Sequence, residues 1–190
     1  MEHVNFEDKT FENIDFAHRK LGVVEYEKCA FVHCDFSGAD LSNARFSACE
    51  FTSCNLSNLK TAKTGLHNVT FKGCKLLGVH FEQCNAFLLS MQFENCRVDF
   101  CSFTRLNLRK TRFKECTFHE ADFAEADLTG SLFDHCDLAR TTFSNTLLEK
   151  VDFRTSYNFS IDPERNRLKK ARFSLAGVPG LLQKYEIDID

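Results

Sequence analysis

Ten cysteines and seven histidines are the side chains of this 190-residue sequence that could bind a metal, form disulfides or act as nucleophile and base. Metal sites and disulfides require side chains that converge on one point, and structural zinc sites usually contain ligand pairs that are close in sequence. No CxxC pair occurs here. All ten cysteines instead occupy one position of a five-residue repeat, two places before its central residue: Cys29, Cys34, Cys49, Cys54, Cys74, Cys84, Cys96, Cys101, Cys116 and Cys136. We therefore expect small, free core residues, with neither a metal site nor disulfides.

The other catalytic signals are weak. The histidines fall at positions that the repeat directs outward: His3, His18, His33, His67, His80, His119 and His135. The sequence contains no glycine-rich phosphate loop, no nucleophile elbow and no HExxH motif. We therefore expect a protein that is not an enzyme and needs no cofactor.

The apolar residues that surround these groups recur every five positions. Helices and strands have side-chain periods of 3.6 and 2, so neither explains a sustained period of five. We interpret four repeats as one square coil, in which residues twenty apart stack at the strand spacing of about 4.7 to 4.9 Å. The first register is Phe6, Phe11, Phe16, Leu21, Tyr26, Phe31, Phe36, Leu41, Phe46, Phe51, Leu56, Leu66, Phe71, Leu76 and Phe81; the second runs from Phe93 through Val98, Phe103, Leu108, Phe113, Phe118, Phe123, Leu128, Phe133, Leu138, Phe143 and Leu148 to Phe153.

This pattern resembles the pentapeptide-repeat proteins, whose units read approximately A(D/N)LXX. Ser37-Gly-Ala-Asp-Leu41 and Glu125-Ala-Asp-Leu128 match that unit closely. The resemblance covers residues 4 to 153 and implies an all-β fold, a right-handed quadrilateral β-helix.

The expected organisation is a single solenoid domain over residues 1–190. N-terminal coils span 1–81, and C-terminal coils in the second register span 93–156. Between them, residues 82–92 contain a register break, because Phe81 and Phe93 are twelve residues apart instead of ten. This break is either a local insertion repaired by packing or a functional hinge. Nothing in the composition predicts a membrane helix, and the N-terminus lacks the features of a signal peptide, so we expect a cytoplasmic protein.

The last segment, 157–190, is expected to mediate dimerisation. Pro179 is suited to the first turn of a short helix, and Ile187 and Ile189 alternate as in a short strand. A symmetric partner would bury apolar side chains that a short helix cannot cover alone. The expected interface is Leu181, Leu182, Tyr185, Ile187 and Ile189.

Residues 161–175 also carry a narrower resemblance. The sequence from Ile161 to Leu168, followed by Lys169 to Leu175 and a Leu-Leu helix, is similar to the tail of the pentapeptide-repeat proteins that protect bacterial type II topoisomerases. That group includes the Qnr quinolone-resistance proteins and the immunity proteins of organisms that produce gyrase poisons. The resemblance implies a tail-to-tail homodimer that mimics duplex DNA and binds DNA gyrase or topoisomerase IV. Because this chain lacks the long loops of many Qnr proteins, we favour immunity to a natural poison, or gyrase inhibition, over strong quinolone protection.

The charge pattern gives partial support to DNA mimicry. The net charge is only −3, but no basic residue occurs between Lys114 and Arg140. We expect this block, with two stacked aspartates near the N-terminus, to contact the partner: Glu115, Glu120, Asp122, Glu125, Asp127, Asp134, Asp137, Asp15 and Asp35. The alternative is that the aspartates before a central residue bind nearby main-chain groups and serve the fold alone.

Two rival functions remain open at this point. Direct nucleic-acid binding would use a basic stretch, which we rank lower because no exposed aromatic residues are interleaved with it: Arg97, Arg105, Arg109, Lys110, Arg112 and Lys114. A general interaction scaffold with another protein partner is also compatible with the repeat.

Overall fold

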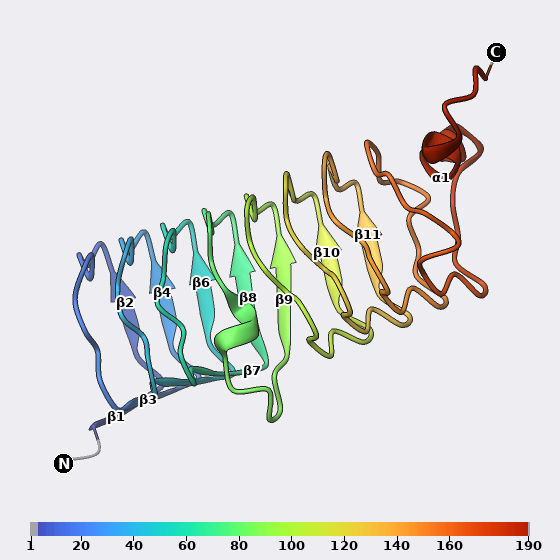
Figure 1. Ribbon diagram of the computed structural model, residues 1–190. Coiled ribbons are helices and arrows are strands. Elements are labelled where there is room, and N and C mark those ends of the chain that lie inside the picture. The colour runs from blue at the N-terminus through green and yellow to red at the C-terminus, as the bar shows by residue number, and fades with distance from the viewer. Residues whose placement is uncertain (1–3, 190) are drawn as a thin grey trace.

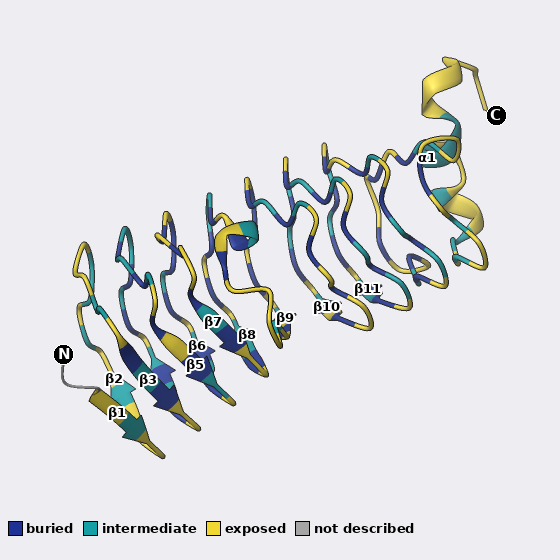
Figure 2. Ribbon diagram, turned by 60° about the horizontal axis from the view of Figure 1, so that its bottom comes forward, coloured by how far each residue is buried: buried dark blue, intermediate teal, exposed yellow. Residues whose placement is uncertain are grey.

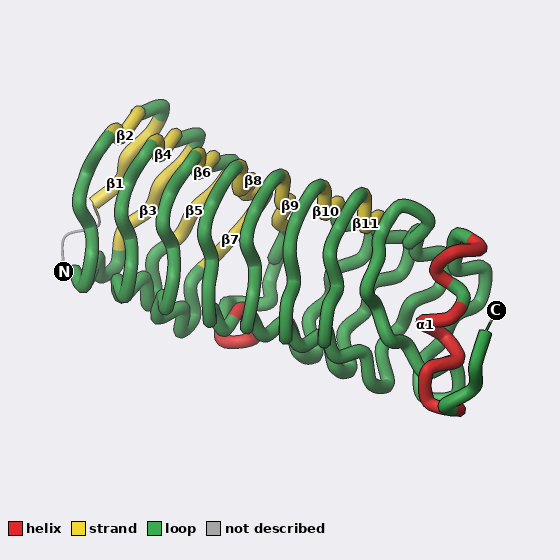
Figure 3. Tube along the Cα trace, turned by 90° about the horizontal axis from the view of Figure 1, so that it is seen from above, coloured by secondary structure: helices red, strands yellow, loops and turns green. Residues whose placement is uncertain are grey.

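Main-chain hydrogen bonds between residues nineteen or twenty-one apart set residues twenty apart side by side along most of the chain. In the computed structural model, which describes residues 4–189, Phe36 N donates to Asn55 O over 2.7 Å. The strand pairs are parallel and in register, as where Phe31 lies beside Phe51. Successive coils therefore stack along a rod, as Figure 1 and the view from above in Figure 3 show. This arrangement confirms the predicted all-β solenoid.

Two of the four sides of the rod form regular parallel sheets. Side one carries a four-stranded sheet made of β1 (Val4–Glu7), β3 (Val24–Glu27), β5 (Arg45–Ser47) and β7 (Gly65–His67). Side two carries a seven-stranded sheet made of β2 (Thr10–Glu12), β4 (Ala30–Val32), β6 (Glu50–Thr52), β8 (Val69–Lys72), β9 (Met91–Glu94), β10 (Arg112–Lys114) and β11 (Leu132–Asp134). Sides three and four pair through single bridges, represented by Asp35↔Asn55 and Asp40↔Lys60.

The corners depend on backbone in the left-handed region. The residue two places after a central residue has a positive φ, for example 54° at Asn13 and 55° at His18. Asparagine and glycine adopt this conformation more readily than other residues. Gly38 suits its corner for a second reason, because a Cβ there would lie 2.6 Å from Nδ1 of His18 and would displace that side chain. A corner every five residues gives the coil its four sides.

The interior of the rod is filled by stacked aromatic rings. Phe31 stacks on Phe51 with centroids 4.7 Å apart, and Phe103 stacks on Phe123 at the same distance with planes 4° apart. Rings on neighbouring sides meet edge to face, a geometry that aromatic pairs favour. Figure 2 shows this buried interior along the coils. The core is therefore a set of continuous apolar columns.

The cysteines line these columns, as the sequence predicts. All ten are free and buried. The structure adds a second reason for their position, because most side chains there donate to a main-chain oxygen of the previous coil. Cys54 Sγ donates to Phe31 O over 3.3 Å, and Thr141 Oγ1 donates to Phe118 O over 2.7 Å. Burial raises the pKa of Cys101 to about 12, which leaves its thiol unreactive at neutral pH.

The register break predicted at residues 82–92 contains a protruding loop on side one, residues 82–90, which ends where β9 begins. It begins with the 3₁₀ helix η1 (Phe81–Gln83), and its Ser90 N returns to Leu66 O over 2.9 Å. The sheet on side one ends at β7, whereas the sheet on side two continues directly from β8 to β9, with Phe71 beside Phe93. The two extra residues are thus accommodated on one side only, and the stack is continuous across the break.

The C-terminal segment contains the helix that the sequence predicts but not the strand. Coil pairing continues to Arg172, followed by η2 (Leu175–Gly177), α1 (Pro179–Leu182) and η3 (Gln183–Tyr185). The predicted strand at Ile187 and Ile189 is wrong, because residues 186–189 lie outside any helix or strand. Alternation of apolar residues favours a strand only where a neighbouring strand supplies hydrogen bonds, and none lies beside this segment within residues 4–189.

Candidate interaction surfaces

The acidic block is distributed around all four sides of the rod. Asp122 lies on side four, Asp127 on side one, Asp134 on side two and Asp137 on side three, as their pairing partners in adjacent coils show. Near the other end, Asp15 and Asp35 stack in register on side three, as expected. The carboxylates therefore form a belt rather than a continuous stripe.

Three of the seven carboxylates of the acidic block pair with arginines of neighbouring coils, and three more lie beside a lysine or a histidine. Arg140 contacts Glu120 at 2.6 Å, and Arg105 contacts Glu125 at 3.1 Å. The remaining pairs are Asp127 with Arg109 at 3.1 Å, Asp134 with His135 at 2.8 Å, Asp137 with His119 at 3.0 Å and Glu115 with Lys114 at 3.9 Å. Among the block residues, only Asp122 has no ion pair within the described range 4–189. Arginines therefore offset three of the seven negative charges of the block.

The aspartates also have a structural role at the corners. The Oδ1 of Asp35 accepts the Ser37 N–H over 2.8 Å, and Asp15 accepts from Ala17 over the same distance. The same bond, from a residue to the N–H two places later, is made by Asp122, Asp127 and Asp137. A side chain that bonds its own backbone two residues later stabilises a turn. These hydrogen bonds support the alternative that the aspartates stabilise the fold rather than contact a partner.

The glutamates of the block lie at a different position. Glu115, Glu120 and Glu125 are the left-handed corner residues, with φ of 53°, 55° and 60°. Their side chains make no main-chain hydrogen bond in residues 4–189. These three glutamates point outward and, unlike Asp122, Asp127 and Asp137, do not stabilise the backbone of a corner.

The basic stretch is also largely neutralised. Arg97 contacts the buried Asp99 at 3.4 Å, and Lys114 contacts Glu94 at 2.7 Å. Arg105 and Arg109 hold carboxylates of the acidic block, as described above. Surface ion pairs of this kind contribute roughly 0 to 1 kcal/mol each and can be exchanged for contacts to a partner. Only Lys110 and Arg112 of this stretch lack an ion pair in the part of the chain that is described.

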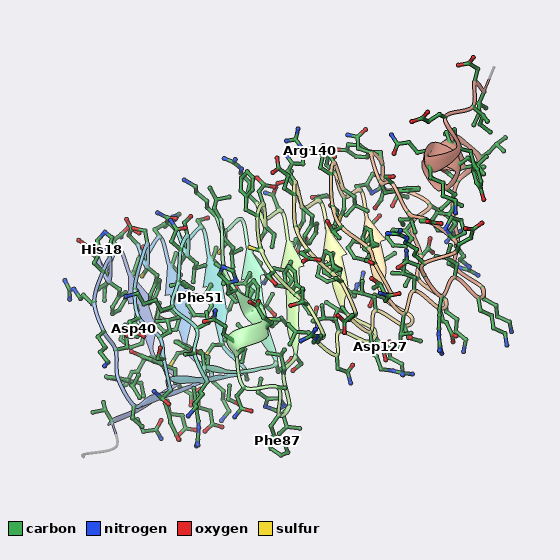
Figure 4. The ribbon with its side chains drawn as sticks, in the orientation of Figure 1. His18, Asp40, Phe51, Phe87, Asp127 and Arg140 are labelled. Carbon is green, nitrogen blue, oxygen red and sulfur yellow. The ribbon has the colours of Figure 1, made fainter. Side chains whose placement is uncertain are left out.

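The loop at 82–90 presents two apolar side chains to solvent. Phe87 is 77% exposed and Leu88 is 58% exposed, whereas Leu89 packs against the core. Figure 4 shows Phe87 at the outer end of the loop, directed away from the rod. Leu88 has a φ of 57°, the left-handed conformation that corner residues throughout this chain also adopt. A hollow of about 280 Å³ separates the loop from Arg109 and Lys110.

The C-terminal segment is attached to the last coil at three points. Ile161 N donates to Gly180 O over 2.9 Å, and a Cβ at Gly180 would lie 2.3 Å from Phe159 O, so only glycine fits. Lys184 contacts Asp162 at 2.7 Å and Glu164 at 2.6 Å. The Lys184 ammonium lowers the pKa of both carboxyl groups.

The predicted interface residues of this segment divide into two sets. Leu181 packs partly against the core, and Leu182 is also partly buried. Tyr185, Ile187 and Ile189 are each more than half exposed, and Tyr185 donates its hydroxyl to Glu164 over 3.0 Å. Ile187 and Ile189, together with the last coil, border a groove of about 910 Å³. Leu175, which we did not include in the interface, is 90% exposed at the same end.

The described residues show neither a metal-binding cluster nor a spanning helix. No group of three or more His, Cys, Asp or Glu side chains in residues 4–189 is placed to hold an ion. None of the helical segments in this range has the length and apolar character needed to cross a bilayer.

The five-residue repeat of this chain matches a known family model. The family model described as "Pentapeptide repeat region" matches residues 4–81, 44–121 and 76–153. This chain belongs to the pentapeptide-repeat family. No curated protein sequence matches it significantly.

Solved structures of other pentapeptide-repeat proteins share the fold. A trypsin-treated variant of QnrB1, a plasmid-mediated fluoroquinolone resistance protein, is 18% identical with a TM-score of 0.54, and the match covers 100% of this chain and 92% of that one. Full-length QnrB1 is 16% identical with the same TM-score, covering 94% of this chain and 100% of that one. HetL from the cyanobacterium Nostoc sp. strain PCC 7120 is 15% identical over 91% of this chain and 87% of that one, with a TM-score of 0.39. At these identities the likeness to the two QnrB1 structures concerns the fold.

The corner aspartates predict an acid-sensitive fold. Main-chain and side-chain hydrogen bonds from Ser37 lower the pKa of Asp35 below its ordinary value of 3.8. A lowered pKa stabilises the folded state above the unfolded value and loses that stabilisation as the pH falls through the folded value. We expect the urea midpoint to fall below about pH 4, and to fall less in Asp35→Asn, whose amide oxygen can still accept the hydrogen bond. Identical pH profiles for the two proteins, measured by circular dichroism, would contradict this role for Asp35.

Proposed function

We propose that this protein binds bacterial DNA gyrase or topoisomerase IV through its outer surface, without catalysis, and protects the enzyme from a poison or modulates it. The poison is a peptide toxin or a quinolone. The observation that carries the proposal is the match to full-length QnrB1 over 94% of this chain. QnrB1 confers fluoroquinolone resistance, and a packed rod has an exterior to offer a partner rather than an enclosed site.

The glutamates at the corners and the protruding loop are the best candidates for the contact. Glu115, Glu120 and Glu125 point outward, and their surface ion pairs are weak enough to be exchanged for a cationic partner. Phe87 supplies an exposed aromatic anchor of the kind that dominates binding energy in protein interfaces. DNA mimicry would therefore depend on the size of the rod and on these glutamates, which would exchange their arginine and lysine partners for cations of the enzyme. The loop would add an apolar contact.

A homodimer through the C-terminal segment fits the same proposal. Leu175, Tyr185, Ile187 and Ile189 expose apolar surface at one end of the rod, beside a groove of about 910 Å³. A second copy related by a two-fold axis would bury these side chains on both molecules. Coils stacked at about 4.8 Å would then give a rod with the length of roughly twenty base pairs.

A general scaffold for another protein partner is the alternative. The same exposed loop favours it, because Phe87 and Leu88 do not specify which partner they contact.

The direct test is a supercoiling and cleavage assay with purified gyrase, with and without a poison. We expect micromolar protein to reduce poison-induced cleavage or to inhibit supercoiling. The double variant Phe87→Ala/Leu88→Ala should require about tenfold more protein, since an anchor residue contributes about 1.4 kcal/mol or more. The matched control is Phe100→Ala, which removes a side chain 55% exposed on side three and should change nothing. Supercoiling and cleavage unaffected by the unmodified protein would exclude the proposal.

The dimer has a separate test. Sedimentation equilibrium should show a dimer for the unmodified chain and a monomer for Leu175→Asp/Ile187→Asp, because two carboxylates would be buried without partners. Val23→Asp changes a valine that is 42% exposed near the other end of the rod and should stay dimeric. A monomer in the unmodified chain would refute this part of the proposal.

A further inference from the structure

Side one of the C-terminal coils gathers cations that are far apart in sequence. The bridges Asn107↔Asp127, Asp127↔Leu147 and Leu147↔Arg167 bring successive coils into register on this side. Five exposed cations then lie over three coil spacings, a set that we call the basic face: Lys110, Lys150, Arg167, Lys169 and Lys170.

The cations of the basic face are unpaired in the part of the chain that the structure describes. Within residues 4–189, none of its five side chains forms an ion pair, whereas most of the acidic block does. Two carboxylates lie on the same side of these coils. Asp127 is held by Arg109 at 3.1 Å, and Glu149 is partly buried. A net positive surface remains.

The fold itself does not require these lysines. Lys150 N donates to Lys169 O over 3.0 Å, which sets Lys150 in register with Lys170, one coil apart. Like charges at that spacing, about 4.8 Å, are destabilising. Lys110, Lys150 and Lys170 also have φ of 58°, 59° and 62°, and the fourth member of their column is Gly130, the residue type that this conformation favours. A function that uses the charge explains their presence better than packing does.

We propose that the basic face binds the phosphate backbone of duplex nucleic acid. Lysine is depleted from the cores of protein interfaces but is a common ligand of phosphate oxygens. Leu147 is the only apolar side chain among the outward positions of this side from 107 to 170, and it is partly buried. Single strands are normally held by stacking on aromatic side chains, and none is present there, which favours a duplex. Three coil spacings span about 14 Å, the rise of roughly four phosphates along one strand.

The proposal is tested by fluorescence anisotropy with a labelled 30-base-pair duplex of random sequence. About four phosphate contacts predict roughly a hundredfold weaker binding at 200 mM than at 50 mM salt. The variant Lys150→Glu/Lys169→Glu/Lys170→Glu should bind at least tenfold more weakly at 50 mM salt. Lys20→Glu/Lys60→Glu/Lys63→Glu is the matched control, because it makes the same change in net charge on side four and should retain more of the affinity.

Three results would overturn the proposal. The first is no anisotropy change with the unmodified protein at 50 mM salt. The second is an equal loss of affinity in both triple variants, which would show an effect of net charge alone. The third is a loss of binding to vesicles containing anionic lipid in the basic-face variant while its duplex binding is unchanged, which would assign the face to a membrane surface instead.

Discussion

The structure depends on one constraint, the stacking of each residue on the residue twenty places later. This spacing allows main-chain groups on a coil to bond to the coils on either side, and it places side chains at equivalent positions directly above one another. Phenylalanine therefore stacks on phenylalanine through the interior, as Phe103 does on Phe123 at 4.7 Å. The same spacing acts outside, where it decides which charges meet. On such a rod, binding to a partner depends on which outward charged side chains form ion pairs within the molecule and which remain unpaired.

The outward columns fall into two classes under this rule. Aspartates before a central residue hold the corner backbone, and Asp35 with Ser37 N at 2.8 Å is an example. Side chains at the left-handed corner positions do not hold the backbone in this way. At these positions the chain has Glu120 and Glu125 on one set of coils and Lys150 and Lys170 on another. The glutamates meet arginines from the next coil, but the lysines meet each other. The rod is thus electrostatically uneven around its circumference, a property that the net charge of −3 conceals.

The sequence was sufficient for the fold and insufficient for the surface. A period of five can be read from Phe6 onward, and the shared position of the cysteines follows from it. The helix at Pro179 was also predictable, since proline favours a first helical turn. The strand at Ile187 was not, because a strand depends on a neighbour that local alternation cannot supply. We predicted the acidic contact surface from carboxylates that are close together in the sequence. In the structure, many ion pairs join residues about twenty apart, such as Arg105 with Glu125. The unpaired basic face escaped notice for the same reason.

The measurement that tests the twenty-residue constraint most directly is urea unfolding of two deletion variants. Removing residues 104–123 joins Phe103 to Ala124 and leaves all later residues in register. Removing residues 104–121 joins Phe103 to Asp122 and shifts every later residue by two positions. The account predicts that the first variant keeps a β-sheet circular dichroism spectrum and cooperative unfolding with a lower midpoint, because only one coil interface is lost. It predicts that the second loses cooperative unfolding; equal behaviour of the two variants would contradict it.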